Sequence, residues 1–224
     1  MSEAADSPNA NPIVYRAVRG VFRLCFGVLG RSIVSGIGSL PPNGPFILAS
    51  NHLSLLDGPL ILAHTPGVIH GVVGVEYRDS PFGPLCTALG CVYVHRGRLD
   101  RLAVRQCRRI LDAGGVLAVA IEGTRSRTRT LMDGKTGVAW LASQAQVPVV
   151  PVAVFGTETV GANLRRLRRS RFHAAFGTPL QPPRAPLSTA ELRDSTRTIM
   201  FELASLLPAE YRCAGAEALE ARIR

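Results

Sequence analysis

With 224 residues, of which 46% are hydrophobic, the chain is long enough for one compact domain with a sizeable buried core. A formal net charge of +10 predicts an anionic partner, namely nucleic acid, an anionic phospholipid surface or a phosphorylated substrate. We expect no nucleic acid among the partners, because no helix-turn-helix, zinc-finger or aromatic RNA-binding signature accompanies the charge.

The N-terminal part divides into a polar tail and an amphipathic helix. Residues 1–11 are polar, which predicts a disordered tail. For residues 12–34 we predict a helix whose arginines share one arc, while the remaining surface is apolar. Such a helix suits a bilayer interface, and packing against its own domain is the alternative. No apolar run is long enough to span a membrane, and Glu3 and Asp6 fit a cleaved signal peptide poorly.

Beyond a turn at residues 41–45, apolar runs alternate with helical segments. The predicted strands are Phe46–Ser50, Val68–Val73, Cys91–His95, Val116–Ile121, Val149–Phe155 and Phe172–Phe176. The predicted helices are Pro59–His64, Phe82–Leu89, Arg98–Ala113, Thr136–Gln146 and Thr189–Leu207. This alternation predicts a single α/β domain over residues 35–210, with a mostly parallel central sheet flanked by helices, followed by a C-terminal tail at 211–224.

The segment that follows the first predicted strand carries His52 and Asp57. Side chains five residues apart do not share a helix face, so the chain must turn for the carboxylate to reach the imidazole. Asp57 would then hold one ring nitrogen of His52 and leave the other to take a proton from a hydroxyl. For this pair alone, a structural histidine is the alternative. Asn51 either steadies the turn or donates a hydrogen bond to an oxyanion.

A second polar loop follows the strand predicted at 116–121. Its residues are Glu122, Gly123, Thr124 and Arg125. Backbone N–H groups and a guanidinium in such a loop suit a phosphate group. Arg96 lies at another strand end. Lys135 is the only lysine of the chain; a coding bias toward arginine is the main explanation, and a position that needs a compact ammonium is the alternative. Each cation alone fits a solvated surface, but their recurrence near strand ends favours an anion site.

A third basic segment lies at residues 165–171, which hold five arginines and no acidic residue. Near an anionic bilayer each such residue contributes about 1 kcal/mol of attraction. A solvated loop is the alternative. If the segment lies beside the N-terminal helix, the two would form a composite membrane anchor.

Four ordered blocks of the chain resemble the glycerolipid acyltransferases, and most of all the 1-acylglycerol-3-phosphate (lysophosphatidic acid) acyltransferases. The blocks are Asn-His-x4-Asp at 51–57, Gly-x5-Arg at 90–96, Glu-Gly-Thr-Arg-Ser at 122–126 and Val-Pro-Val-Val-Pro-Val at 147–152. The resemblance covers about residues 35–180. The chain departs from the family pattern at Gly74, His95 and residues 120–121, none of which removes a group that the chemistry requires.

The resemblance implies that His52 is the catalytic base, that Asp57 is its partner, and that a set of loop residues binds the substrate phosphate. That set is Arg96, Glu122, Gly123, Thr124, Arg125 and Lys135. The implied reaction moves a fatty acyl chain from acyl-CoA to the free hydroxyl of lysophosphatidic acid, giving phosphatidic acid in phospholipid synthesis. Acyl carrier protein is the alternative donor. Glycerol 3-phosphate or another lysolipid is the alternative acceptor, and a non-catalytic lipid-binding protein is the alternative from a different class.

No cofactor and no metal are expected, and acyl-CoA would act as a co-substrate. His52 and Asp57 lack further ligands at metal-binding spacing, and the five cysteines form no CxxC or Cys/His pattern, which predicts reduced thiols. No Gly-x-Ser-x-Gly elbow supports a serine hydrolase. We expect a peripheral or monotopic enzyme at an anionic membrane surface, on the cytoplasmic face of the cell membrane.

Overall fold

The computed structural model describes residues 10–212. The two predicted tails, 1–11 and 211–224, therefore lie outside the described residues except at their inner ends. There the Asn11 side chain accepts hydrogen bonds from two backbone N–H groups of the first helix. At the other end the Tyr211 hydroxyl donates a hydrogen bond to Glu158, so this residue is packed onto the domain.

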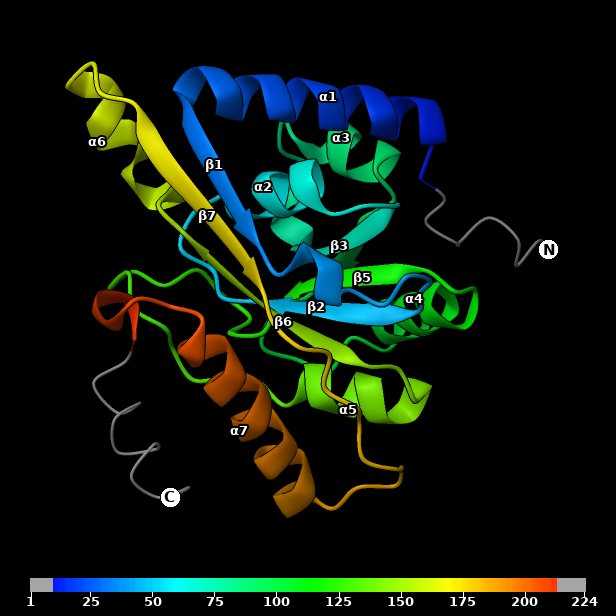
Figure 1. The fold of residues 1–224 in the computed structure, drawn as a ribbon. Coiled ribbons are helices and arrows are strands. Elements are labelled where there is room, and N and C mark those ends of the chain that lie inside the picture. Colours follow the sequence, from blue (N-terminus) through cyan, green and yellow to red (C-terminus); the bar gives the residue numbers. More distant parts are fainter. Residues whose placement is uncertain (1–9, 213–224) are drawn as a thin grey trace.

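Seven strands form one sheet in the order β1-β7-β6-β2-β5-β3-β4 (Figure 1). The strands are β1 (Gly30–Ser35), β2 (Phe46–Ser50), β3 (Ile69–Gly74), β4 (Val92–Val94), β5 (Val116–Ala120), β6 (Val149–Phe155) and β7 (Ser170–Phe176). All neighbouring strands run parallel except β6 and β7, so β1 and β7 run against the rest. The predicted mostly parallel sheet is confirmed.

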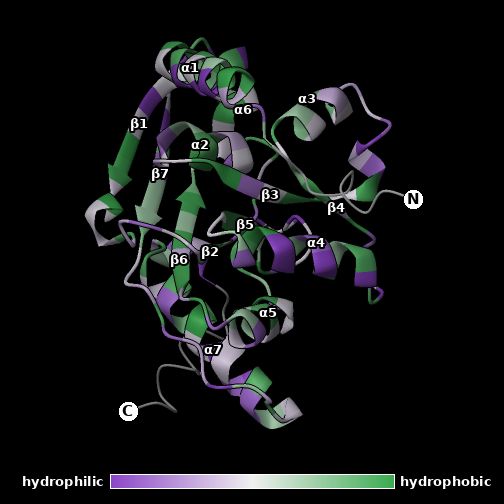
Figure 2. Ribbon diagram, turned by 90° about the vertical axis from the view of Figure 1, so that its right-hand side faces the viewer, coloured by the Kyte–Doolittle hydropathy of each residue, from purple (hydrophilic) through white to green (hydrophobic). Residues whose placement is uncertain are grey.

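Helices cover both faces of the sheet. They are α1 (Pro12–Leu29), α2 (Asp57–His64), α3 (Gly83–Ala88), α4 (Arg101–Asp112), α5 (Gly137–Ala145), α6 (Val160–Arg165) and α7 (Thr189–Ser205). One apolar core lies between the sheet and α1 with α2, and a second lies between the sheet and α4, α5 and α7 (Figure 1). In Figure 2 the strands are mainly hydrophobic, while α4 alternates hydrophilic and hydrophobic residues, and its hydrophilic residues are mostly exposed. The continuous apolar runs of the sequence are therefore strands buried on both faces.

The N-terminal helix ends at Leu29, before the predicted boundary at 34, and the edge strand β1 takes its place. Gly30 pairs with Ser170 of β7, and a Cβ atom at Gly30 would lie 2.0 Å from the Ser170 carbonyl oxygen. Only glycine allows the two backbones to approach this closely. The β-branched residues Ile33 and Val34 then continue the pairing.

Arg19 and Arg23 of α1 lie where the helix meets α2. Arg19 donates hydrogen bonds to the carbonyl oxygens of Leu62 and Gly67, and Arg23 donates to that of Ala63. The carbonyls of Leu62 and Ala63 belong to the last turn of α2, which has no helical N–H partners and favours cations. The predicted arginine stripe is thus partly a protein contact.

Strand register places the two polar motifs side by side. Ser50, the last residue of β2, lies opposite Ala120 at the end of β5 and opposite Val152 in β6. The segments that begin at Asn51 and Ile121 therefore leave the carboxyl edge of the sheet at the same level. This edge is where α/β sheets of this kind bind ligands.

Candidate active site

His52 and Asp57 meet in the turn between β2 and α2. The His52 Nδ1 atom lies 3.0 Å from Oδ2 of Asp57. The Asp57 side chain is 2% exposed and that of His52 is 19% exposed, so the carboxylate is buried and the imidazole reaches the surface of the site. The predicted contact between the two side chains is present, while their catalytic role stays a prediction.

The Asp57 carboxylate also fixes the shape of the turn. Its Oδ2 atom accepts hydrogen bonds from the backbone N–H groups of Leu53 and Ser54, each at 2.7 Å. Its Oδ1 atom accepts a hydrogen bond from the hydroxyl of Thr157, in the short 3-10 helix η4 (Thr157–Thr159). Charge-assisted bonds of this kind hold a carboxylate firmly. The sequence reasoning missed Thr157, because nothing marks a single threonine 100 residues from its partner.

Asn51 joins the turn to β6. Its side-chain Oδ1 accepts from the N–H of Val154 and its Nδ2 donates to the Val154 carbonyl, both at 2.7 Å. The side chain is buried. Since the amide group is committed to this backbone pair, the structure favours the steadying role over donation to an oxyanion.

The loop after β5 holds the backbone of His52 from both sides. The N–H of His52 donates to Oε1 of Glu122 at 2.7 Å, and its carbonyl accepts from the N–H of Ser126 at 2.8 Å. The other Glu122 oxygen accepts from the N–H of Met132 at 3.0 Å. Glu122 is 1% exposed and does not line the cavity described below. Its contacts give it a positioning role, and direct contact with a phosphate stays a prediction.

Burial raises the pKa of the Glu122 carboxyl from 4.5 to about 7, although the N–H groups of His52 and Met132 act in the opposite direction. The folded protein binds the Glu122 proton more tightly than the unfolded chain does, so the protonated carboxyl favours the folded state. This stabilisation is complete below pH 4.5 and is lost as the pH rises through about 7. The loss amounts to about 3 kcal/mol. We expect the stability advantage of wild type over Glu122→Gln to shrink across this window, which urea denaturation measures. Parallel stability curves would contradict the buried carboxyl as the cause.

A cavity of about 520 Å³ adjoins the imidazole. His52, Asp57, Arg96, Gly123 and Lys135 contribute to its wall, and most of the remaining lining is apolar. The apolar lining comes from α1, α2, α3 and the residue after it, β3, β4, β5 and α5, and includes Phe22, Leu62, Ile69, Val72, Leu85, Leu89 and Val119. A cavity that is mostly apolar with a few polar groups in its wall suits an amphiphilic ligand.

Apart from Glu122, which is buried, the structure separates the predicted anion-binding residues into two groups. Arg96, Gly123 and Lys135 line the cavity, whereas Thr124 and Arg125 are exposed and lie outside its wall. Gly123 has φ of +71°, and a Cβ atom there would lie 3.4 Å from Cγ of Lys135. The positive φ favours a glycine, whereas a Cβ atom would only come into ordinary van der Waals contact with the stem of the lysine.

Arg96 has an internal partner that the sequence reasoning did not give it. Its Nη1 atom lies 2.9 Å from Oε1 of Glu76, and both side chains are partly exposed. An exposed pair of this kind contributes little to stability. An anionic ligand can therefore replace the Glu76 carboxylate at small cost.

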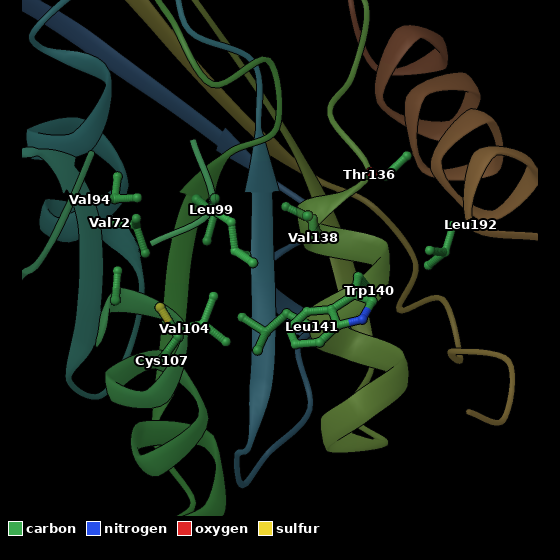
Figure 3. Close-up of a pocket in the computed structure, with 13 residues that line it drawn as sticks. Val72, Val94, Leu99, Val104, Cys107, Thr136, Val138, Trp140, Leu141 and Leu192 are labelled. Carbon is green, nitrogen blue, oxygen red and sulfur yellow. The ribbon is translucent and has the colours of Figure 1, made fainter. Parts of the chain in front are cut away.

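A second hollow of about 510 Å³ lies on the opposite face of the sheet (Figure 3). Leu99, Val104 and Cys107 line it from the α4 side, and Trp140 and Leu141 line it from α5. Its wall shares five residues with the first cavity: Val72, Val94, Val119, Gly137 and Val138. The two apolar spaces therefore adjoin at the ends of the strands.

His95 has a carboxylate partner, although the sequence reasoning gave it none. Its Nδ1 atom lies 2.8 Å from Oδ2 of Asp100, so the spacing of His52 and Asp57 recurs. This second pair is more exposed, lies outside both hollows, and Asp100 also caps α4. Within residues 10–212, no group of three or more His, Cys, Asp and Glu side chains could hold a metal ion.

Comparisons with known proteins show to which family the chain belongs. A protein-family model described as Acyltransferase matches residues 31–155. A probable 1-acyl-sn-glycerol-3-phosphate acyltransferase of Mycoplasma pneumoniae is 29% identical over 157 residues, covering 63% of this chain and 59% of that protein. The sheep (Ovis aries) 1-acyl-sn-glycerol-3-phosphate acyltransferase alpha is 27% identical over 185 residues, covering 77% of this chain and 63% of that protein. The chain thus spans less than two thirds of the length of these relatives.

A solved structure shares the fold over most of the chain. It is the 1-acyl-sn-glycerophosphate (LPA) acyltransferase PlsC of Thermotoga maritima, with a TM-score of 0.67 and 26% sequence identity. The match covers 93% of this chain and 80% of that one.

Proposed function

The chain belongs to the acyltransferase family, and from this membership and its cavity we propose that it transfers a fatty acyl group from a thioester to lysophosphatidic acid. The product would be phosphatidic acid. The observation that carries the proposal is the His52 imidazole, oriented by Asp57, at the wall of a mostly apolar cavity that also contains Arg96 and Lys135. The base, the site for the acyl chain and the site for the phosphate then lie next to one another.

The reaction follows from the orientation of the imidazole. With its Nδ1–H donated to Asp57, His52 offers Nε2 to the substrate hydroxyl and takes its proton. The hydroxyl oxygen attacks the thioester carbonyl, giving a tetrahedral oxyanion. When this intermediate collapses, the carbon–sulfur bond breaks and the thiolate takes the proton from the imidazolium. An ester and a free thiol result, and the histidine is restored.

The apolar wall supports a place for the acyl chain, and the cations support a place for the phosphate. Arg96 and Lys135 lie in the same wall as His52, so an anchored phosphate would hold the hydroxyl near the base. We propose acyl-CoA as the donor, with acyl carrier protein as the alternative. No resident cofactor takes part in this reaction.

Thiol release from palmitoyl-CoA tests the proposed reaction. Release that depends on added lysophosphatidic acid supports acyl transfer. Release without acceptor indicates a thioesterase, and no release with either acyl-CoA or acyl carrier protein as donor favours the non-catalytic lipid binder. Glycerol 3-phosphate in place of the lysolipid tests the alternative acceptor.

Arg96→Ala is expected to raise the KM for lysophosphatidic acid by about ten- to hundredfold, because a charge-assisted bond to the phosphate is lost. The KM for a neutral monoacylglycerol should stay unchanged. Arg98→Ala removes a nearby exposed arginine that does not line the cavity and serves as the matched control. The same comparison with Arg125→Ala tests the predicted role of that residue. Equal losses on both acceptors contradict a phosphate role.

We propose that the protein works at an anionic membrane surface on the cytoplasmic side, with α1 lying in the interface. No helix within residues 10–212 is long and apolar enough to cross a membrane. The face of α1 opposite Phe22 carries exposed apolar side chains at helical spacing, namely Ile13, Ala17, Val21, Leu24 and Val28. Because Phe22 lines the cavity, α1 connects this outer face with the site.

The arginines at residues 165–171 also support an orientation in which α1 faces the membrane. Arg169 donates hydrogen bonds to the carbonyl oxygens of Gly27 and Gly30, so the segment lies against the end of α1 (Figure 1). Its remaining arginines are exposed and suit anionic head groups.

Leu24→Glu is expected to lower the fraction of protein bound to anionic vesicles by about tenfold or more, because it replaces an inserted apolar side chain with a charge. Leu24 is 68% exposed. Leu102→Glu, at a 60% exposed leucine of α4, is the matched control and should bind as wild type does. Vesicle flotation measures both. Equal binding of the two variants contradicts insertion of α1.

A further inference from the structure

Two cysteines, Cys86 and Cys91, line the catalytic cavity from one short segment of the chain. Cys86 lies in α3 and Cys91 directly precedes β4, and both belong to the same cavity wall as His52. The acyl-transfer reaction proposed above uses neither thiol.

The backbone brings the two residues within the reach of a disulfide. The N–H of Cys91 donates to the carbonyl oxygen of Cys86 at 2.9 Å. With standard bond lengths, this bond limits the distance between the two Cα atoms to about 6.8 Å, the upper end of the range that disulfides span. The two thiols are also hydrogen-bonded to each other.

The two sulfur atoms differ in reactivity. The hydrogen bond from Cys91 lowers the pKa of the Cys86 thiol to about 7, and it raises the pKa of the Cys91 thiol. Cys86 is therefore substantially ionised near neutral pH, and the thiolate is the form that reacts with oxidants. Cys91 is placed to attack the oxidised sulfur, as a resolving cysteine does.

We propose that a peroxide converts Cys86 and Cys91 into a reversible disulfide that restricts the acyl cavity. The Cys86 thiolate attacks hydrogen peroxide, giving a sulfenic acid and hydroxide. The Cys91 thiol then attacks the sulfenic sulfur, forming the disulfide and releasing water. A dithiol reductant reverses the reaction by thiol–disulfide exchange.

The disulfide changes the wall because the sulfurs must approach to about 2.05 Å. The new bond ties α3 to the residue that precedes β4. Phe82, Leu85 and Leu89 belong to the same segment and line the same cavity, so the bond restrains them. We expect weaker binding of a long acyl chain, and a slower reaction; the second effect rests on the proposed function.

Tryptic mass spectrometry of the full chain detects the disulfide. Cleavage after Arg78 and Arg96 gives one peptide, 79–96, that contains both cysteines, while Cys25, Cys107 and Cys213 fall in other peptides. After hydrogen peroxide, this peptide should lose two hydrogen atoms in wild type and recover them with dithiothreitol. Oxidation of Cys86 that stops at sulfinic acid, or disulfides that join two chains, would overturn the proposal.

Two further measurements test how the disulfide changes ligand binding in the cavity and the rate of the reaction. Peroxide should weaken binding of the fluorescent fatty acid cis-parinaric acid by about tenfold and slow acceptor-dependent thiol release by a similar factor. Cys86→Ser and Cys91→Ser should each keep after peroxide the binding and rate that they had before, and Cys25→Ser should respond as wild type does. A disulfide that leaves parinaric acid binding unchanged overturns the effect on the cavity. If untreated protein releases no thiol, the proposed function fails, whereas the peptide mass and the fatty-acid binding still test the disulfide.

Discussion

Replacement of His52 with alanine is expected to lower kcat by about 10²–10⁴-fold, because the substrate hydroxyl loses its proton acceptor. The KM for lysophosphatidic acid should change little, since Arg96 and Lys135 remain in the cavity wall. Acceptor-dependent thiol release from palmitoyl-CoA measures both constants. A variant that keeps more than a few per cent of the wild-type rate contradicts the assignment of His52 as the base.

Two controls accompany the His52 variant. The His52 backbone is held by Glu122 and Ser126, so the alanine variant should keep the wild-type fold, which circular dichroism and thermal melting check. His95→Ala removes the other histidine that has an aspartate partner at the same spacing, but outside the cavity. It should stay within about threefold of the wild-type rate.

Asp57→Asn is expected to lower kcat by about 10²–10⁴-fold, no more than the loss of His52 itself, because Asp57 acts through the imidazole. An amide at this position no longer fixes the tautomer of His52 or stabilises the imidazolium. It also disturbs the turn, because an NH₂ group faces donors that the carboxylate now accepts from. We expect a loss of about 1–3 kcal/mol in the free energy of unfolding, which urea denaturation measures.

The Thr157→Val variant distinguishes the effect of Asp57 on stability from its effect on the rate. It removes one donor to Oδ1 and leaves the contact between Oδ2 and His52 intact. We expect this variant to lose stability with only a small loss of rate.

The double variant Asp57→Asn/His52→Ala tests whether the two side chains act together. Its kcat should lie no more than about threefold below that of the slower single variant, because the effects of residues that act as a unit are non-additive. Additive losses would show that the two side chains act independently.

The sequence predicts the fold through its local patterns and misses what depends on distant partners. Each predicted strand and each helix beyond residue 35 has a counterpart in the structure. The edge strand β1 was missed because its pairing with β7 joins segments about 140 residues apart. A short run of serines and branched residues beside an apolar helix gives no signal of that partner.

The candidate site shows the same difference between local contacts, which the sequence predicts, and contacts with distant segments, which it does not. The contact of His52 with Asp57 follows from a local spacing that only a turn can satisfy. Thr157 and the carboxylate of Glu122 act on this turn from distant segments, so their targets depend on strand register. The position of Arg125 outside the cavity depends on how its loop folds, which composition and spacing do not determine.

Helix α2 connects α1 to the Asp57 carboxylate. Its first residue is Asp57, and Arg19 and Arg23 donate hydrogen bonds to carbonyls of its last turn. A helix of eight residues, about 12 Å long, therefore has Asp57 at one end and contacts α1 at the other. We expect a tilt of α1 to move α2 and, with it, the Asp57 carboxylate. If α1 lies on a bilayer, as proposed, membrane contact would then change the orientation of the His52 imidazole.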